Sequence, residues 1–275
     1  MKKNKTRILY FCTHWGNALP FPKFCANVRK AGFDGVEMDL PLQKKSRREI
    51  VSILKDQGLL LIGQYWQSLE PAFRQNRTAY RQHLENLVEA SPLLINAQTG
   101  KDYFTLAQNL ELVRLARKVQ DDSGIRILHE THRGKFLFCL PVLVRALQEE
   151  PEMEITLDAS HWCNVHESLL IDQQAAMQKA IRAAGHVHAR VGFEEGPQVN
   201  DPRAVEWANT LETHFGWWDG VVRRHERAGL DLTVTPEFGP APYMPSAPHT
   251  MRPLARQWDV NLHMAELFRK RYPRT

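Results

Sequence analysis

Short apolar runs alternate with amphipathic stretches along the whole chain. The apolar runs are rich in β-branched and aliphatic residues and predict eight strands: Ile8–Thr13, Gly35–Asp39, Leu59–Gln64, Leu93–Ala97, Ile125–Glu130, Glu154–Asp158, His186–Arg190 and Leu232–Glu237. The stretches with helical periodicity predict helices over 73–90, 105–120, 140–149, 168–184, 203–228 and 255–270. Regular alternation of strands and helices indicates parallel pairing, and eight such units favour a closed α/β barrel, (β/α)8, over an open sheet.

One helix start and one helix end carry local signals. Ser46 is followed three residues later by Glu49, ahead of the apolar Ile50 and Val51, which predicts a capping box. Gly58 stands where this helix is expected to end, directly before the third strand. The sequence therefore predicts a helix between the second and third strands.

Composition narrows the class of protein. Of the 275 residues 43% are hydrophobic and 24% charged, which is typical of globular proteins and excludes disordered and collagen-like classes. Barrels of about 250 residues commonly form one domain, so we expect a single domain over residues 1–275. Lys and Arg (36) exceed Asp and Glu (31) by only 5, too few to indicate a nucleic-acid partner.

The spacing of the cysteines and the length of the apolar runs indicate the cellular compartment to expect. Cys12, Cys25, Cys139 and Cys163 lie far apart, which favours reduced thiols and a cytoplasmic protein. The sequence contains no apolar run of 18 residues, so we expect no membrane association. A homo-oligomer is compatible with these features.

Four of the later strands end in ionisable residues on one face. Side chains alternate between the two faces of a strand, and aliphatic residues such as Ile127, Leu157 and Val187 take the outward face, towards the helices. The opposite, inward face then receives four residues near the strand ends: Glu130, Asp158, His188 and Glu237. We expect these side chains to meet at one mouth of the barrel.

Three carboxylates at one mouth repel one another, and each is costly to bury without a partner. A divalent cation held by the three carboxylates and one imidazole removes this cost. The oxygen-rich ligand set favours Mn²⁺ or Mg²⁺, with Co²⁺ and Zn²⁺ as alternatives. Taken singly, each acid is equally compatible with a surface salt bridge at a strand end.

Five segments carry a resemblance to a known family. They are Gly32–Glu37, His129–Gly134, Leu157–His161, Val187–Arg190 and Pro236–Gly239. In order and spacing they resemble the xylose isomerase-like TIM barrels, which comprise sugar isomerases, epimerases, inosose dehydratases and the endonuclease IV branch. The resemblance spans nearly the whole chain. It implies a (β/α)8 barrel whose metal ligands are Glu130, Asp158, His188 and Glu237, and in which His161 contacts a substrate hydroxyl.

The chemistry that fits this set is proton abstraction next to a sugar carbonyl. A metal ion would stabilise the cis-enediolate as a Lewis acid, while Glu130 and Glu237 would remove and return the proton. Six further residues at the predicted strand ends and loops are candidates for substrate binding: His161, Arg190, Trp15, Trp66, Lys135 and Glu194. The expected activity is that of a sugar isomerase or epimerase.

Two other functions remain open. A metal-dependent dehydratase of the inosose type needs the same enediolate, and a non-catalytic sugar-binding barrel would use the acids only for hydrogen bonds. A trinuclear endonuclease site is disfavoured, because Gln64 and Asn96 stand where extra ligands would be expected. Three prolines in the 238–245 loop remove backbone donors, which favours a neutral sugar over a phosphorylated one.

Overall fold

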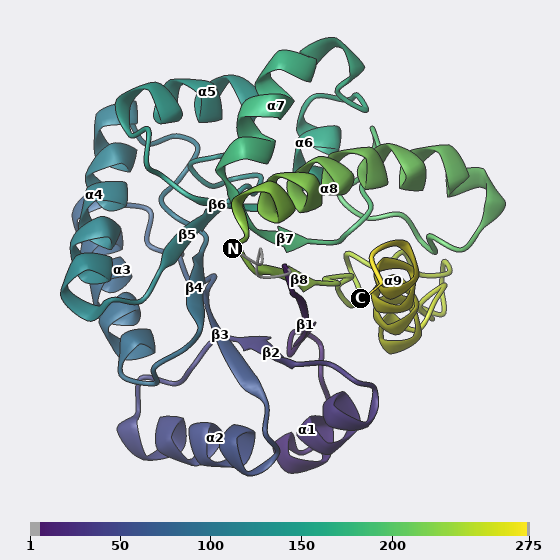
Figure 1. Cartoon of the computed structure of the whole chain (residues 1–275), viewed down its shortest axis with the longest axis horizontal. Coiled ribbons are helices and arrows are strands. Elements are labelled where there is room, and N and C mark those ends of the chain that lie inside the picture. The colour runs from purple at the N-terminus through teal and green to yellow at the C-terminus, as the bar shows by residue number, and fades with distance from the viewer. Residues whose placement is uncertain (1–5, 274–275) are drawn as a thin grey trace.

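Eight parallel strands close into a barrel in sequence order in the computed structural model, which describes residues 6–273 (Figure 1). The strands are β1 (Ile8–Thr13), β2 (Gly35–Met38), β3 (Leu60–Tyr65), β4 (Leu94–Ala97), β5 (Ile127–Glu130), β6 (Ile155–Leu157), β7 (Ala184–His188) and β8 (Leu232–Thr235). The ring closes where Ile8 of β1 pairs with Leu232 of β8. The predicted (β/α)8 barrel is confirmed.

Helices surround the strands (Figure 1). They are α1 (Phe21–Lys30), α2 (Lys44–Asp56), α3 (Phe73–Val88), α4 (Leu106–Ser123), α5 (Leu140–Glu149), α6 (Ala159–Val165), α7 (Gln174–Ala183), α8 (Ala208–Ala228) and α9 (Gln257–Arg271), with 3₁₀ turns η1 (Ile171–Gln173) and η2 (Val205–Trp207). The sequence analysis missed α1 and α6. Helix α1 has Pro20 at its N-cap and Pro22 in its first turn, where proline is tolerated, so these prolines do not mark a loop.

The predicted capping box at Ser46 is wrong. Helix α2 already begins at Lys44, so Ser46 lies inside its first turn and its hydroxyl donates to Gln43 Oε1 at 2.8 Å. A reciprocal box occurs instead at the start of α4, where Thr105 and Gln108 cap each other. The prediction that this helix ends at Gly58 is confirmed, because Gly58 follows α2 with a left-handed φ of +63°.

Strand β7 differs from its prediction by a shift along the chain. It begins at Ala184 and ends at His188, so Arg190 lies beyond the strand. Helix α7 ends at Ala183, and the chain therefore enters the sheet without a loop. His188 keeps its predicted inward face, and it pairs in register with Thr235 of β8.

The barrel interior has an apolar floor and a polar upper layer. Phe11, Ile62, Leu94 and Leu128 form a buried cluster of their own inside the sheet. Two residues further along the last three of these strands stand Gln64, Asn96 and Glu130, all buried. Because side chains two apart share a face, the polar layer lies one pleat nearer the carboxyl ends of the strands.

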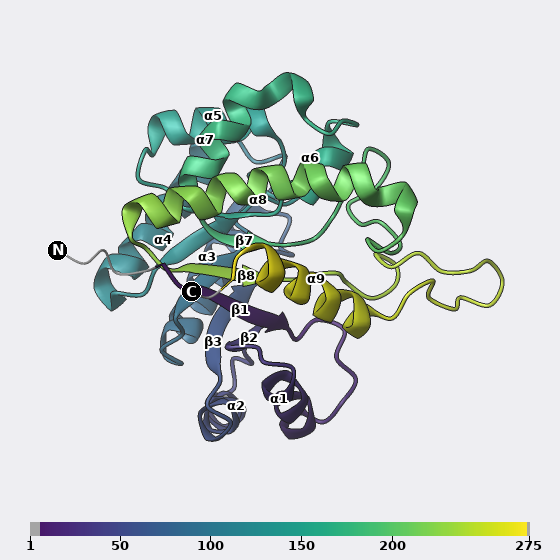
Figure 2. The same ribbon diagram turned by 45° about the vertical axis from the view of Figure 1, so that its right-hand side comes forward.

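The carboxyl ends of the strands carry the longest loop. Figure 2 shows β1 pointing towards this end, where the segment between β8 and α9 extends away from the barrel. Between residues 6 and 273, no helix combines the length and apolar character that crossing a bilayer requires. All four cysteines are free thiols. The cytoplasmic location stays a prediction, and so does the single domain over 1–275, whose ends (1–5 and 274–275) lie outside the described residues.

Candidate metal centre

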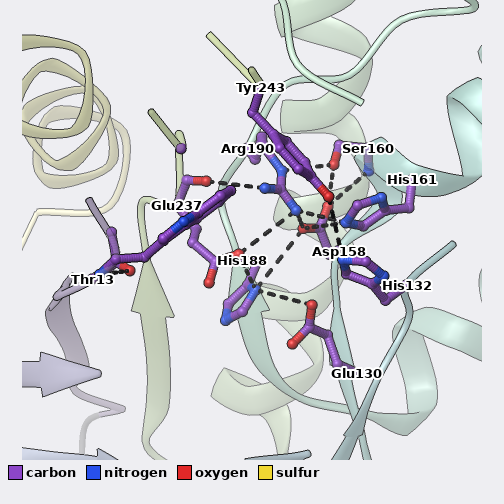
Figure 3. Close-up of polar contacts among 12 residues, drawn as sticks. Thr13, Glu130, His132, Asp158, Ser160, His161, His188, Arg190, Glu237 and Tyr243 are labelled. Atoms are coloured by element: carbon purple, nitrogen blue, oxygen red, sulfur yellow. Dashed lines mark hydrogen bonds and ion pairs between the residues drawn. The ribbon is translucent and has the colours of Figure 1, made fainter. Parts of the chain in front are cut away.

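Four side chains from consecutive strands meet at the carboxyl end of the barrel (Figure 3). Glu130 and His188 are the last residues of β5 and β7, Asp158 follows β6 directly, and Glu237 lies two residues beyond β8. Each offers one ligand atom, and these atoms all lie within 4.8 Å of one another. All four residues are buried. The convergence predicted from strand alternation is therefore present in the structure.

The donor set fits a divalent cation. Three carboxylates supply hard oxygen ligands, and His188 supplies one nitrogen. His188 Nδ1 lies 2.9 Å from Glu237 Oε2 and 3.9 Å from both Glu130 Oε1 and Asp158 Oδ2. Even so, this atom has no well-aligned hydrogen bond among residues 6–273. A buried nitrogen that faces three carboxylates without such a bond is a ligand atom suited to a metal ion.

Arg190 supplies positive charge to the same group. Its Nη2 lies 2.5 Å from Asp158 Oδ2 and 3.6 Å from Glu237 Oε2, while its Nε donates to Ser160 Oγ at 3.1 Å. The side chain is only 1% exposed. Arg190 therefore offsets part of the carboxylate charge, a contact that strand alternation alone does not reveal.

Burial and the neighbouring charges raise the pKa values of three ligands, Glu130, Asp158 and His188. Burial, together with the nearby carboxylates of Glu237 and Asp158, raises the pKa of Glu130 to about 8. Burial alone would lower the pKa of His188, but the surrounding carboxylates of Glu237, Glu37 and Glu130 hold it well above its ordinary value. Both groups therefore carry a proton near neutral pH before a cation binds.

These protons predict a pH dependence of metal binding. Mn²⁺ affinity should rise with pH over the range around pH 8, because protonated Glu130 and His188 must release their protons to act as ligands. Calorimetric titrations in two buffers of different ionisation enthalpy measure the affinity and the number of protons released. Equal affinity and no proton release across this range would contradict the assignment of these ligands.

A cavity of about 470 Å³ opens beside the four ligands. Trp15 and Trp66 line it and are 37% and 44% exposed, and Arg190 and Glu237 line its base. Tyr243, from the loop after β8, lines it too, with its ring 5.0 Å from the ring of Trp15. The two predicted tryptophans thus line this cavity, and their contact with a substrate stays a prediction.

Three other predicted binding residues do not belong to the lining of this cavity. His161 is buried and accepts a hydrogen bond from Arg190 Nη2 at 2.7 Å. Lys135 is 8% exposed, and its Nζ donates to Ser68 O at 3.2 Å, so the lysine holds the loop after β3. Glu194 lies in a turn between the bridged residues Phe193 and Gly196. Their roles in substrate binding stay predictions.

Sequence reasoning missed two residues that the structure brings to the site. Glu37, the third residue of β2, is buried and contacts His188. A single acid on a strand of apolar residues was the available signal, but its partner lies 151 positions away. Tyr243 sits in the proline-rich loop, and its ring lies 5.1 Å from the guanidinium of Arg190. Nothing in its local sequence distinguished it.

Comparison with known proteins identifies the family. The family model described as the xylose isomerase-like TIM barrel matches residues 25–222. The chain belongs to this family. The resemblance inferred from the five sequence segments is confirmed. A search of curated proteins returned no match.

Solved structures of xylose isomerase-like barrels share the fold at low sequence identity. A xylose isomerase-like TIM barrel protein from Mycobacterium smegmatis, in complex with magnesium, is 11% identical, with a TM-score of 0.62 and coverage of 98% of this chain and 99% of that one. The 3-keto-D-glucoside 4-epimerase from E. coli is 15% identical, with a TM-score of 0.58 and coverage of 97% and 100%. A probable 3-DHS dehydratase from Bacillus anthracis is 14% identical, with a TM-score of 0.55 and the same coverage.

Proposed function

We propose that this xylose isomerase-like barrel is a divalent-metal-dependent isomerase or epimerase of a keto-sugar or a polyol-derived ketone. The observation that carries the proposal is the meeting of two glutamates from β5 and β8, Glu130 and Glu237, at a buried cation-type site beside a cavity. Proton transfer at a carbon next to a carbonyl needs two such groups and compensation of charge on oxygen.

The cation is Mn²⁺ or Mg²⁺ in this proposal, held by Glu130, Asp158, His188 and Glu237. When bound, it would supply Lewis-acid stabilisation of negative charge on the substrate oxygens. The 3-keto-sugar epimerase and the magnesium complex among the structural neighbours are compatible with this choice. Co²⁺ and Zn²⁺ remain alternatives that a metal titration would distinguish.

The two glutamates differ in their surroundings, which suggests a division of roles. Glu237 lines the cavity and accepts a hydrogen bond from Gln64 Nε2 at 2.9 Å, which stabilises a carboxylate suited to take a proton from carbon. Glu130, whose pKa is about 8, accepts hydrogen bonds from Asn96 at 2.8 Å and Gln98 at 3.2 Å. With the cation bound it is a carboxylate, so in the proposal it first takes a proton from solvent and then returns that proton to carbon.

The surroundings of the cavity favour a neutral substrate. Phosphate sites in barrels use backbone N–H groups after the seventh and eighth strands. After β8, the N–H of Phe238 donates to Asn261 at 2.8 Å and that of Gly239 to Gln198 at 2.7 Å. After β7, the N–H of Gly192 donates to His214 at 3.1 Å. With these donors engaged, we expect a small unphosphorylated sugar, placed by Trp15 and Trp66 and by the polar candidates around them.

Deuterium exchange tests the proposal. The Mn²⁺-loaded protein, incubated in D₂O with a panel of keto-sugars and inositol-derived ketones, should place deuterium on the carbon next to the carbonyl, because the enediolate is reprotonated from a carboxyl group in exchange with solvent. Mass spectrometry and NMR measure the label, and a sample treated with chelator is the control. Turnover without label would count against proton transfer.

A matched pair of substrates tests the expected class. The free sugar should be turned over at least as well as its phosphate ester, because the backbone donors after β7 and β8 are already engaged. Comparison of kcat/KM for the two measures this preference. A value at least about tenfold higher for the phosphorylated sugar would overturn the expected substrate class.

A metal-dependent dehydratase is the second candidate. The observation that favours it is the position of Glu237 on the cavity wall, since a dehydratase needs the same proton abstraction before a hydroxyl group leaves. The same incubations separate the two activities. An unsaturated ketone with loss of water indicates a dehydratase, whereas a labelled isomer indicates the proposed function. Ligand binding without either product would indicate a non-catalytic sugar-binding barrel.

A further inference from the structure

Glu37 lies beneath the candidate metal centre and is not one of its four ligands. The side chain is completely buried at the third position of β2, paired in register with Thr13 of β1. Its Oε1 lies 3.0 Å from His188 Nε2, and its Oε2 lies 3.1 Å from His186 Nε2. A buried carboxylate so close to a proposed metal ligand calls for an explanation.

The contact with Glu37 determines which nitrogen of His188 carries a proton. A carboxylate oxygen only accepts a hydrogen bond, so the Nε2 that faces Glu37 must be the donor. The other ring nitrogen, Nδ1, faces Glu130, Asp158 and Glu237, and once it has released its proton its lone pair points at these carboxylates. The ring is thus oriented with Nδ1 as the atom that can bind a cation.

Glu37 is itself held in place by several donors. Thr235 Oγ1 donates to its Oε2 at 2.6 Å, and Asn96 Nδ2 donates to its Oε1 at 2.9 Å. The same Asn96 nitrogen donates to Glu130 Oε2 at 2.8 Å, so one amide links Glu37 to a second ligand.

Glu37, His186 and His188 also lie close enough together for a cation, but their polar atoms are already engaged. Both oxygens of Glu37 accept hydrogen bonds, and His186 Nδ1 lies 2.9 Å from the carbonyl oxygen of Thr233. A hydrogen-bonded support beneath the proposed centre accounts for these contacts better than a second metal site does.

We propose that Glu37 is a positioning residue that holds His188 with Nε2 protonated and Nδ1 directed at the metal, and that Asn96 joins this support to Glu130. The inference rests on the metal centre of the proposed function. Groups that orient a metal-bound imidazole in this way typically change metal affinity by about 10–100-fold when they are removed.

Metal titration of Glu37→Gln tests the inference. Glutamine keeps the size of the side chain and removes its charge, so Mn²⁺ and Zn²⁺ affinity measured by calorimetry should fall by about 10–100-fold. Asp39→Asn is the matched control. It removes the same charge two residues further along, where the carboxylate contacts Gln67 at 2.7 Å. Its metal affinity should stay within about twofold of the wild type, which separates the His188 contact from a general charge effect.

A spectroscopic measurement on the wild-type protein gives a second, independent test. In the Zn²⁺-loaded protein, ¹⁵N NMR of His188 should show Nε2 protonated and Nδ1 bound to the metal. The Nε2 proton should also show the downfield shift of a hydrogen bond to the Glu37 carboxylate, which a role of Glu37 in packing alone would not produce. Unchanged metal affinity in Glu37→Gln, or coordination through Nε2, would overturn the inference. If Glu37→Gln does not fold, the wild-type spectrum alone decides.

Neither measurement uses a substrate, so the two proposals can fail separately. A protein that binds metal through Nδ1 of His188 but turns over none of the sugars overturns the isomerase proposal and supports the role of Glu37. If the protein isomerises a sugar and Glu37→Gln binds metal normally, the isomerase proposal is supported and the role of Glu37 is overturned.

Discussion

Glu237→Gln is expected to lower kcat by about 10²–10⁴-fold, the range that a general base contributes, while the barrel stays folded. Glutamine keeps the volume of the side chain but cannot take a proton from carbon. The loss should fall on kcat more than on KM, because Trp15, Trp66 and the rest of the cavity wall remain. Steady-state kinetics of the Mn²⁺-loaded protein, with circular dichroism to check folding, measure this effect.

The exposed Glu195 offers a control for Glu237→Gln. It lies in the loop after β7, so Glu195→Gln removes one acid from a neighbouring loop without touching the cavity wall. Its kcat should equal that of the wild type. Near-normal kcat in Glu237→Gln would mean that Glu237 has only a structural role.

Arg190→Met is expected to destabilise the metal-free protein by about 3–5 kcal/mol, because it leaves a buried carboxylate without its partner. Asp158 loses a contact of 2.5 Å, and Glu237 loses one of 3.6 Å. Added Mn²⁺ should restore most of the lost stability, since a cation that binds only the folded state stabilises it. Urea unfolding with chelator and with Mn²⁺ measures both effects.

Arg190→Lys keeps the charge but loses the planar donor group that reaches Asp158 and Ser160 together. We expect its free energy of unfolding to lie between those of the wild type and Arg190→Met. If Arg190→Met unfolds at the same urea concentration as the wild type in chelator, the salt bridge with Asp158 does not stabilise the fold.

Strand alternation predicted the metal set because the relevant information is local. Ile127 and Leu157 pack outward, and this alone assigns Glu130 and Asp158 to the inside. The different bounds of β7 did not matter, since the face of His188 is set by alternation with its outward neighbour Val187 and not by where the strand begins. The number of strands and their parallel order follow from the same short-range pattern.

The contacts across the barrel could not be predicted in this way. The role inferred for Glu37 depends on its contact with His188. The position of Lys135 depends on a hydrogen bond to the carbonyl oxygen of Ser68 in another loop. Local sequence describes Lys135 as a loop lysine, and only tertiary packing buries it. Tyr243 and Arg190 meet for the same reason, through the folding of the loop after β8 over the mouth.

The apolar floor beneath the polar layer closes the barrel below the centre within residues 6–273. Phe11, Ile62, Leu94 and Leu128 fill the barrel below the four ligands, and the cavity opens on the other side. In the proposed enzyme, the ion and the sugar would therefore share this cavity as their route to the centre. A sugar bound in the cavity would then block the exit of the ion, so we expect a chelator to remove the ion quickly from the protein without sugar and slowly from the protein with sugar bound.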